Sequence, residues 1–472
     1  MQRTVVVVGG GISGLTIAYE LAERSQRLGN GVRVLCLEAS DRPGGNIRSE
    51  RAVGFTCEAG PTGFLDNAPA TITLARRLGL ADRMVRARPE ANDRYIFRKG
   101  KLRKVPLDAV SFLGSGILSP LGKLRLLGEP LAPRSRKDDE SVFAFAARRI
   151  GGEAAATLVD AMVSGVYAGN VHELSLGATF PKMREMEQRH GSLFRAMLAK
   201  RKEARAEGRE AGGPAGPGGV LTSFKSGLDE LTDALARELA DKLRLRNRVQ
   251  QVADMGQRGY RVLLEEGAPI EADVVVLACP AWNAAPVVEG MDGELHRAIG
   301  EIGSAALVVV HTGFRTLALG DQPAGFGFLV PRGQGPRILG TLWISSIFGG
   351  RAPEGSSLLT TMIGGAHDPR AIELDDRTLL DLVRADLKSA MSIMVAPYFV
   401  RIVRWSRGIP QYELGHPRRL ETIEGRLREH PGLFAAGNSY RGISVNACVE
   451  EAPRVAEAAL EFLSSRADTA VG

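Results

Sequence analysis

The N-terminal segment constrains the fold more than any other part of the chain. It reads TVVVVGGGISGLTIAYELAE over residues 4–23, so four valines lead into a glycine-rich turn and then into apolar residues at helical spacing. Glycines in G-x-G-x-x-G register let the backbone approach a pyrophosphate, whose charge the free N–H groups of a helix N-terminus stabilise. The segment therefore predicts a dinucleotide site formed by Gly9, Gly10, Gly11, Ile12, Ser13 and Gly14.

A second apolar run, Val32 to Leu37, supplies the next strand of a βαβ unit. It ends at Glu38, which lies 24 residues after Gly14, where such a unit places the acid that accepts hydrogen bonds from the ribose hydroxyls. Glycine turns also occur for packing alone, but the strand, the helix and the spacing of Glu38 together favour nucleotide binding. We include Glu38 and Ala39 among the expected cofactor contacts.

The segment that follows distinguishes between dinucleotides. EASDRPGGNIRS, residues 38–49, adds Arg42, two glycines and Asn46, an extension that an NAD-binding unit does not need. The run resembles the second phosphate loop of FAD-dependent amine oxidases; the alternative is a surface turn with a solvated arginine. GFTCEAGPTGF, residues 54–64, supplies a turn that in this superfamily passes close to the flavin. We therefore predict non-covalently bound FAD, which also contacts Gly60, Pro61, Thr62 and Gly63.

Composition narrows the class of protein. A chain of 472 residues predicts two or three domains, and 44% hydrophobic with 24% charged residues excludes a disordered or fibrous protein. The net charge of +7 is spread along the chain without a nucleic-acid module, so we predict no nucleic-acid partner. The four cysteines are far apart and have no metal-type spacing to the histidines. They predict reduced, mostly buried thiols in a cytoplasmic protein, and no metal site.

The order of patterns predicts an α/β protein with a discontinuous FAD domain. The predicted parts are 1–89, 220–290 and 417–472 for the FAD domain, 90–210 for a helical domain, 211–219 for a flexible linker and 291–416 for a β-rich substrate domain. Because the first strand begins at residue 4 without a cleavage-type segment before it, we expect no signal peptide. The apolar stretch Val274 to Val288 contains Pro280 and Pro286, so we expect a strand plus a turn rather than a membrane span.

Five further motifs give a specific resemblance. They are RYIFRKGKLRKVP (94–106), GFGFLVP (325–331), LGTLWISSIFGGRAP (339–353), RWSRGIPQYELGH (404–416) and GNSYRGISVNACV (437–449). In this order they resemble the oxygen-dependent protoporphyrinogen oxidases over nearly the whole chain. The resemblance implies an FAD domain of p-hydroxybenzoate-hydroxylase type, a substrate domain and an α-helical membrane-binding domain. It also implies six-electron oxidation of protoporphyrinogen IX to protoporphyrin IX in three flavin turnovers, with O2 reduced to H2O2.

The resemblance assigns expected roles residue by residue. Arg94 is similar to the arginine that faces a propionate, Leu329 and Leu342 to an aliphatic pair around a pyrrole ring, and Met362 to a residue against a neighbouring ring. Flat apolar walls with one or two cations suit a large macrocycle that carries anionic groups. The full set of expected contacts is Gly327, Arg94, Leu329, Leu342 and Met362 for the substrate, and Val249, Trp405, Ile443, Ser444 and Val445 as further flavin contacts.

Several alternatives stay open at the sequence level. Some members of the family carry Arg or Asn where Thr62 stands, so a coproporphyrinogen oxidase with a four-propionate substrate is not separated from a protoporphyrinogen oxidase. A flavin amine oxidase would share the FAD motifs, and a flavin-free binding protein like the Rab GDP-dissociation inhibitors would share the scaffold. No histidine or carboxylate pair stands out as a general base, so we expect the protein mainly to orient the substrate against the flavin.

Two further expectations concern surfaces and the C-terminal segment. The apolar and basic mixture at residues 110–136 is typical of a segment that lies in a membrane interface, at the inner face of the cell membrane. A second copy of the chain is another candidate partner.

LFAAGNSYRGISVNACVEEA, residues 433–452, predicts a strand, a glycine turn and a helix that begins near Val445 and closes the flavin site. Pro453 is expected to kink this helix or to end its first stretch.

Overall fold

A five-stranded parallel sheet carries the N-terminal motif. The computed structural model describes residues 2–29, 31–106, 108–206, 219–320 and 324–469. The strand order is β10 (Leu243–Arg244), β2 (Arg33–Leu37), β1 (Thr4–Val8), β14 (Val274–Leu277) and β20 (Leu433–Ala435). All four pairings are parallel. The strands come from both ends and the middle of the chain, which confirms that the 274–277 and 433–435 segments return to the nucleotide-binding unit.

Alternating side chains of these strands enter two different cores. Val5 and Val7 pack with helices α1 (Ile12–Leu28), α11 (Asp229–Leu239) and α17 (Val445–Thr469) on one face. Val6 and Val8 pack on the other face. That face is covered by β11 (Val249–Asp254), β12 (Tyr260–Leu264), β13 (Ile270–Ala272), α12 (Ala281–Val288), α13 (Gly293–Gly300) and α16 (His416–Glu429). Continuous valine runs suit strands that are buried on both faces.

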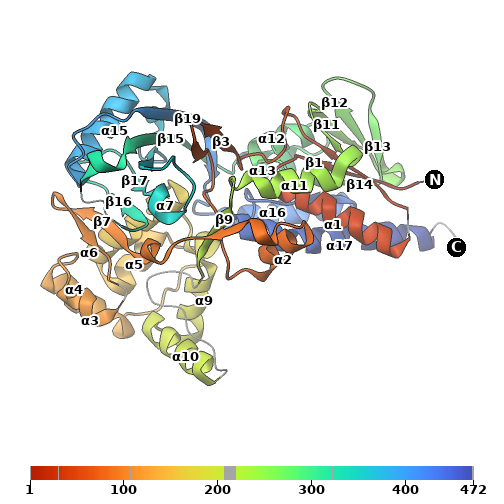
Figure 1. Cartoon of the computed structure of the whole chain (residues 1–472). Helices are drawn as coiled ribbons and strands as arrows, with labels where there is room; N and C mark the ends of the chain where they lie inside the picture. Colours follow the sequence, from red (N-terminus) through yellow and green to blue (C-terminus); the bar gives the residue numbers. More distant parts are fainter. Residues whose placement is uncertain (1, 30, 107, 207–218, 321–323, 470–472) are drawn as a thin grey trace.

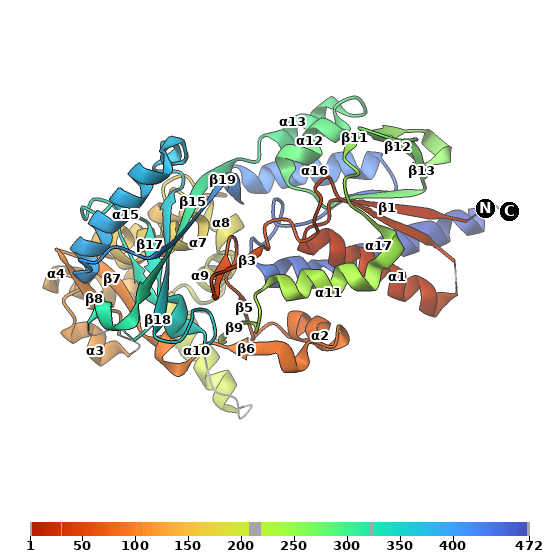
Figure 2. The same cartoon turned by 45° about the horizontal axis from the view of Figure 1, so that its top comes forward.

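A seven-stranded mixed sheet forms the second unit and lies beside the first (Figures 1 and 2). Its order is β19 (Phe399–Pro410), β15 (Ser304–Arg315), β18 (Ser356–Gly364), β17 (Gly340–Leu342), β16 (Gly327–Leu329), β7 (Arg94–Arg98) and β8 (Lys101–Lys104). Helix α15 (Asp376–Met391) covers one face, where Leu379, Val383 and Leu387 pack on Val308 and Val310. The opposite face is therefore turned away from α15.

Short elements connect the two sheets. They are the hairpin β3 (Ser49–Ala52) and β4 (Phe55–Glu58), the small sheet of β5 (Phe64–Leu65), β9 (Leu221–Phe224) and β6 (Met84–Arg86), and helix α14 (Ile344–Ile347). Helix α2 (Pro69–Arg77) packs in the core with α1 and α17. The helical segment contains α3 (Ala109–Gly114), α4 (Pro120–Leu127), α5 (Val142–Ile150), α6 (Gly152–Ala154), α7 (Asp160–Tyr167), α8 (Leu176–Thr179), α9 (Pro181–His190) and α10 (Leu193–Ala206). Figure 1 shows α10 at the far end of this segment, away from both sheets.

The predicted elements are largely confirmed, with three differences. The predicted helical domain begins at residue 90, but residues 94–104 form strands β7 and β8 of the seven-stranded sheet, before the first α-helix of that segment. The expected turn after β14 is instead helix α12, with Pro280 at its N-cap and Pro286 inside it. Of the predicted linker 211–219, only Gly219 belongs to the described residues. The limits of the domains stay a prediction.

Pro453 does not end the C-terminal helix. Helix α17 runs without a break from Val445 to Thr469, so the expectation that its first stretch ends at the proline is wrong. Ala452, Val455 and Ala456, on either side of the proline, are buried in the core that α17 forms with α1. This packing outweighs the single backbone hydrogen bond that a proline removes. Among the described residues, no helix is both long and apolar enough to cross a bilayer.

Candidate active site

The glycine turn between β1 and α1 packs closely on itself and on the segment that follows β14. A Cβ atom added at Gly14 would collide with the carbonyl oxygen of Gly9, and one at Gly9 would lie 2.9 Å from the backbone nitrogen of Cys279. Gly9 also has a φ of +108°, which favours glycine. Gly11 differs, because a Cβ atom there would have no neighbour within 4 Å. The turn is thus tightly packed on its protein side and open at Gly11.

Glu38 lies at the carboxyl end of β2, beside this turn. Its Oε2 accepts the backbone N–H of Gly10 at 2.6 Å, and its Oε1 accepts both the backbone N–H and the hydroxyl of Ser40. The backbone oxygen of Glu38 accepts the N–H of Asn247 at 2.8 Å. This bond brings the start of β11, including the predicted contact Val249, next to Glu38. The arrangement leaves lone pairs of the carboxylate for ribose hydroxyls.

The second glycine-rich loop, residues 42–47, is held in shape by hydrogen bonds from the side chain of Arg42 to its backbone. Its guanidinium donates to the carbonyl oxygens of Pro43, Gly45 and Ile47 at 3.1, 2.6 and 3.2 Å. Burial lowers the pKa of Arg42. The N–H of Gly44 donates to the carbonyl oxygen of Gly10 at 2.8 Å, so the two glycine loops are joined directly. Arg42 thereby fixes the loop shape that the sequence predicted for a diphosphate.

These loops fit the diphosphate of FAD. Helix α1 has no side-chain cap and no acidic residue in its first turn, so no carboxylate competes for its N-terminal N–H groups. Gly44 and Gly45 have φ values of +101° and +58°, and a Cβ at Gly45 would lie 3.2 Å from the Cα of Gly11. Residues with side chains would fill this cradle. The donor set and the open space at Gly11 therefore suit an anionic dinucleotide.

The turn after β4, residues 59–63, lies between the two sheets. The unit built on the five-stranded parallel sheet is called the flavin unit, and the seven-stranded sheet is called the substrate sheet. Trp405 on β19 donates its indole N–H to the carbonyl oxygen of Ala59 at 2.7 Å. Asn46 donates its amide to the carbonyl oxygen of Gly408 at 3.1 Å, and a Cβ at Gly60 would collide with the backbone of Asn46. A Cβ at Gly63 would likewise collide with the backbone of Thr222, while Pro61 and Thr62 are half-buried between these anchors.

The C-terminal segment reaches the same place. A Cβ at Gly437 would lie 3.2 Å from the hydroxyl of Ser13, and the N–H of Gly437 donates to Glu451 at 2.9 Å. Ile443 packs against the buried cluster of α7 and Tyr412, and Val445 is buried. The hydroxyl of Ser444 accepts the N–H of Ala447 at the start of α17. Ser13 and the N-terminus of α17 are thus neighbours, as the strand-turn-helix pattern predicted.

The predicted substrate residues share one face of the seven-stranded sheet. Arg94, Gly327 and Leu342 are paired across β7, β16 and β17. Two residues further along β16, Leu329 pairs with Gly340 on β17, and Gly340 pairs with Met362 on β18. Because residues two apart on a strand point to the same side, all five occupy the face opposite α15. Met362 and Trp405 belong to the same apolar cluster on this face, so the wall continues to the flavin turn.

Helix α7 covers part of this wall. A Cβ atom at Gly165 would lie 2.5 Å from a methyl group of Leu329, and Ala168 packs in the cluster with Met362. The N-terminal end of α7 is fixed by an ion pair of Asp160 with Arg332, at 2.8 Å. The space beside Leu329 is therefore bounded by the sheet on one side and by a glycine-bearing helix on the other.

Arg94 has no partner of opposite charge within the part of the chain that the structure describes. Its guanidinium lies 5.2 Å from the centre of the Phe326 ring. The residue is exposed overall, yet the surrounding protein withdraws its charged group partly from water and lowers the pKa of Arg94. An unpaired arginine beside an apolar wall is suited to bind an anionic group of a ligand.

Three features of this region escaped the sequence interpretation. His311 is buried on the same face, with its Nδ1 2.8 Å from the hydroxyl of Thr360, and burial lowers its pKa to about 4. Glu451 is held at Gly437, and burial raises its pKa. Glu58 forms a buried ion pair with Arg351. Each contact joins residues far apart in sequence, and no local pattern signals it.

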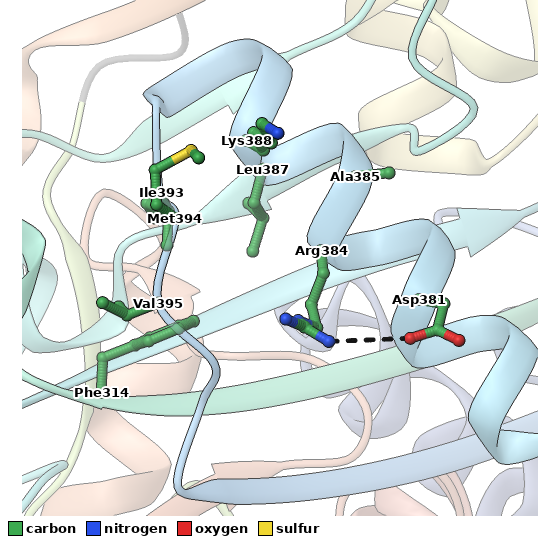
Figure 3. A pocket seen from close by; sticks show the side chains of 9 residues that line it. All are labelled: Phe314, Asp381, Arg384, Ala385, Leu387, Lys388, Ile393, Met394 and Val395. Atoms are coloured by element: carbon green, nitrogen blue, oxygen red, sulfur yellow. Dashed lines mark ion pairs between the residues drawn. The ribbon is translucent and has the colours of Figure 1, made fainter.

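A cavity of about 250 Å³ lies on the other side of the sheet. Figure 3 shows its lining from α15, from Phe314 on β15 and from the segment Ile393–Val395, with Arg384 directed at Asp381. Phe314 belongs to the core beneath α15, so this cavity is separated from the face that carries Arg94. It is not part of the candidate active site.

The fold and the cofactor cradle define a flavin-dependent oxidoreductase with FAD as its cofactor. A family model described as flavin containing amine oxidoreductase matches residues 12–460, and the chain belongs to this family. Its four cysteines are free, three of them buried. The flavin fold with a separate substrate sheet agrees with the fold class predicted from the sequence.

Relatives over the full length narrow the comparison. The chain is 33% identical to the chloroplastic protoporphyrinogen oxidase of Nicotiana tabacum, covering 97% of this chain and 86% of the relative. It is 29% identical to the coproporphyrinogen III oxidase of Bacillus subtilis, covering 98% and 99%. A crystal structure from Exiguobacterium sp. 255-15, provisionally assigned as a protoporphyrinogen oxidase, has a TM-score of 0.81 at 26% identity and covers 98% and 99%. Cyclohexylamine oxidase from Brevibacterium oxydans shares the fold, with a TM-score of 0.72 at 17% identity.

Two glycine substitutions should separate packing from cofactor binding. Gly11→Ala adds a methyl group where no protein atom lies within 4 Å, so the flavin-free protein should keep its Tm while FAD retention falls about tenfold or more, ~1.4 kcal/mol. Gly14→Ala places the methyl group against the carbonyl of Gly9 and should lower the Tm itself, by an overpacking cost of ~1–3 kcal/mol. Thermal unfolding and flavin content after dialysis measure both effects. Normal FAD retention by Gly11→Ala would contradict the assigned cradle.

Proposed function

We propose that this protein oxidises protoporphyrinogen IX to protoporphyrin IX in tetrapyrrole biosynthesis, with O2 as electron acceptor and H2O2 as by-product. The observation that carries the proposal is the sheet face on which Arg94, Leu329, Leu342 and Met362 lie together, joined to the flavin turn through Trp405. The full-length relatives named as porphyrinogen oxidases support it. An apolar wall with one unpaired cation matches a large macrocycle with anionic substituents.

The protein residues then have the following proposed roles. Leu329, Leu342 and Met362 bury the rings, Gly327 leaves room for a ring to approach the strand, and Arg94 binds a propionate. When bound, FAD accepts a hydride from a substrate carbon and passes the electrons to O2. The remaining flavin contacts proposed from the sequence, among them Ile443, Ser444 and Val445, orient the cofactor. No acid or base is assigned, since burial lowers the pKa of His311 to about 4 and so makes its imidazole a weak proton acceptor.

A second candidate substrate is coproporphyrinogen III. The Bacillus subtilis relative of that name matches 98% of this chain, at an identity close to that of the tobacco relative. The chemistry at the flavin would be the same, but the four propionates of this ring require more cationic contacts than Arg94 alone. A flavin amine oxidase is the closest enzyme of another substrate class, and a flavin-free binding protein is the non-enzyme alternative.

Anaerobic mixing with each reduced porphyrin tests the proposed reaction. Protoporphyrinogen should bleach the visible flavin absorbance faster than coproporphyrinogen, and O2 should then restore it with release of H2O2. The reverse order of rates would make coproporphyrinogen the substrate. H2O2 from a primary amine, with none from either porphyrinogen, would contradict the proposal, and a colourless purified protein would favour the non-enzyme alternative.

Arg94→Ala should weaken binding of a substrate that carries propionates. Loss of a charge-assisted contact, ~1.5–3 kcal/mol, corresponds to a KM increase of about tenfold or more, with a smaller effect on kcat. Lys101→Ala is the matched control, because it removes a positive charge from the same β7–β8 hairpin at an exposed position. Steady-state kinetics on both variants measure the difference. An unchanged KM in Arg94→Ala would remove this residue from the site.

We also propose a cytoplasmic protein that contacts the inner face of the cell membrane through α3 and α4. Five exposed apolar side chains lie on these helices and on the turn that follows them, between 53% and 87% exposed: Val110 on α3, Leu121, Leu124 and Leu127 on α4, and Leu131 after α4. Apolar side chains of this kind partition into the interface of a bilayer. Formation of a homodimer stays a prediction, and sedimentation velocity would measure the oligomeric state.

Vesicle binding tests this membrane contact. Leu121→Ser with Leu124→Ser should reduce co-sedimentation with vesicles of neutral and anionic phospholipids several-fold, because each change removes apolar area from the membrane-facing surface. Leu317→Ser is the control, since Leu317 is 97% exposed but lies after β15 in the other unit. Equal binding by the double variant and the wild type would contradict the assigned surface.

A further inference from the structure

The hairpin β3–β4 is held between the flavin unit and the substrate sheet by buried charge. Glu58, the last residue of β4, accepts the hydroxyl of Ser49 at 2.5 Å and the N–H of Leu228 at 3.0 Å, both within the flavin unit. Its Oε1 also lies 3.4 Å from the guanidinium of Arg351. The side chains of Glu58 and Arg351 are only 3% and 2% exposed. Glu58 directly precedes Ala59–Gly63, the turn assigned to the flavin.

Arg351 belongs to the substrate unit. It lies between β17, which ends at Leu342, and β18, which contains Met362. Its guanidinium donates to the hydroxyl of Ser223 and to the carbonyl oxygen of Phe224, both at 2.9 Å. Its backbone oxygen accepts the N–H of Thr56 on β4 at 3.0 Å. The connection between the two substrate strands is thus bonded to the flavin hairpin by side chain and backbone.

Stability alone does not account for such a pair. Two charges lose their hydration when buried, and well-packed apolar residues often serve a fold equally well or better. Each charge is oriented by its own hydrogen bonds, from Ser49 and Leu228 to the carboxylate and from Nη2 of Arg351 to Ser223 and Phe224. The Nη1 of Arg351 forms no hydrogen bond to a described residue and faces Glu58 at 3.4 Å, so the contact between the two side chains is an attraction of charges held in fixed positions.

The bond from Trp405 to Ala59 is a second connection between the turn after β4 and the substrate sheet, and the ion pair of Glu50 with Arg401 joins the hairpin to the same strand, β19. Together these contacts fix the turn at both ends of the wall.

We propose that Glu58 and Arg351 are positioning residues whose ion pair fixes Leu342 and Met362 relative to the flavin-binding turn. This inference rests on the proposed use of that sheet face for a porphyrinogen. Neither residue touches the substrate or the cofactor in this role. Their effect is on orientation, and reaction rates are sensitive to displacements of about 1 Å at the reacting atoms.

The charge of Glu58 adds a pH dependence to this contact. Burial raises the pKa of Glu58 to about 7, although Ser49, Arg351 and Leu228 act in the opposite direction. Asp229 on α11 faces the same carboxyl and raises its pKa further. Since the pKa in the folded state exceeds the unfolded value of 4.5, the contribution of Glu58 to the free energy of unfolding is largest below pH 4.5. It declines as the pH rises toward about 7.

Three variants of the FAD-loaded protein test the proposal. Glu58→Gln keeps the shape of the side chain but removes its charge, and Glu58→Gln with Arg351→Gln removes both charges, so no buried charge is left unpaired. Arg77→Gln is the control, since it breaks an ion pair with Glu20 that joins α2 to α1 inside the flavin unit. The limiting rate of anaerobic flavin reduction and the apparent Kd for protoporphyrinogen are measured per bound flavin, as functions of pH.

The expected result is a split between rate and affinity. Both Glu58 variants should reduce flavin about tenfold more slowly or worse, with the apparent Kd changed less than about threefold, whereas Arg77→Gln keeps the wild-type rate per bound flavin. The wild-type rate should fall as the pH drops below about 7, because Glu58 then becomes protonated and loses its charge, whereas Glu58→Gln should stay slow at every pH. If Glu58→Gln does not fold with FAD, the double variant gives the result. A wild-type rate per bound flavin in the double variant, or in Glu58→Gln, would overturn the proposal.

A substrate-free measurement separates this inference from the proposed function. Visible circular dichroism of the oxidised, bound flavin should differ from that of the wild type in Glu58→Gln and in the double variant, and stay unchanged in Arg77→Gln. A wild-type spectrum in both Glu58 variants would overturn the positioning role. If the spectra differ but no porphyrinogen reduces the flavin, the proposed function fails while the connection between Glu58 and the flavin turn stands.

Discussion

The close backbone contact at the first glycine turn is the constraint on which the rest of the structure depends. Gly14 packs against the carbonyl of Gly9, Gly9 against Cys279, and Gly10 accepts a hydrogen bond from Gly44. A side chain at Gly9 or Gly14 would force apart the ends of β1 and β14, and one at Gly10 would push against Glu38. Because the cofactor cradle consists of backbone, its geometry follows directly from this packing. Arg42 and Glu38 then complete it with side-chain contacts.

The two sheets use the alternation of side chains for different purposes. In the parallel sheet, neighbouring valines of β1 enter two cores, so both faces contribute to stability. In the seven-stranded sheet, Val308 and Val310 pack beneath α15, while the opposite face carries Arg94, Leu342 and Met362. One face therefore anchors the sheet, and the other carries the residues proposed to bind the substrate. Trp405 connects that second face to the flavin turn.

Local patterns predicted those elements whose hydrophobic period is clear. The valine strand, Glu38 after the second strand, and the helix that begins at Val445 all follow from short-range spacing. The pairing of β7 with β16 could not be predicted from local patterns, because residues 94 and 327 meet only through the tertiary fold. The sequence did not predict the buried pair of Glu58 and Arg351 or the contact of Glu451 with Gly437 for the same reason. At Pro453 and Pro286, packing of the surrounding helix outweighed a local signal that usually predicts a break.

The parallel sheet has a consequence for the order in which the chain can mature during synthesis. Its strands come from residues 4–8, 33–37, 243–244, 274–277 and 433–435, and α17 follows the last of them. The substrate sheet is therefore translated before the flavin unit receives its final strand. A nascent chain has to keep the half-built cradle soluble until β20 and α17 emerge from the ribosome. The complete cradle therefore becomes available to FAD only after the last strand and helix of the parallel-sheet unit have been made.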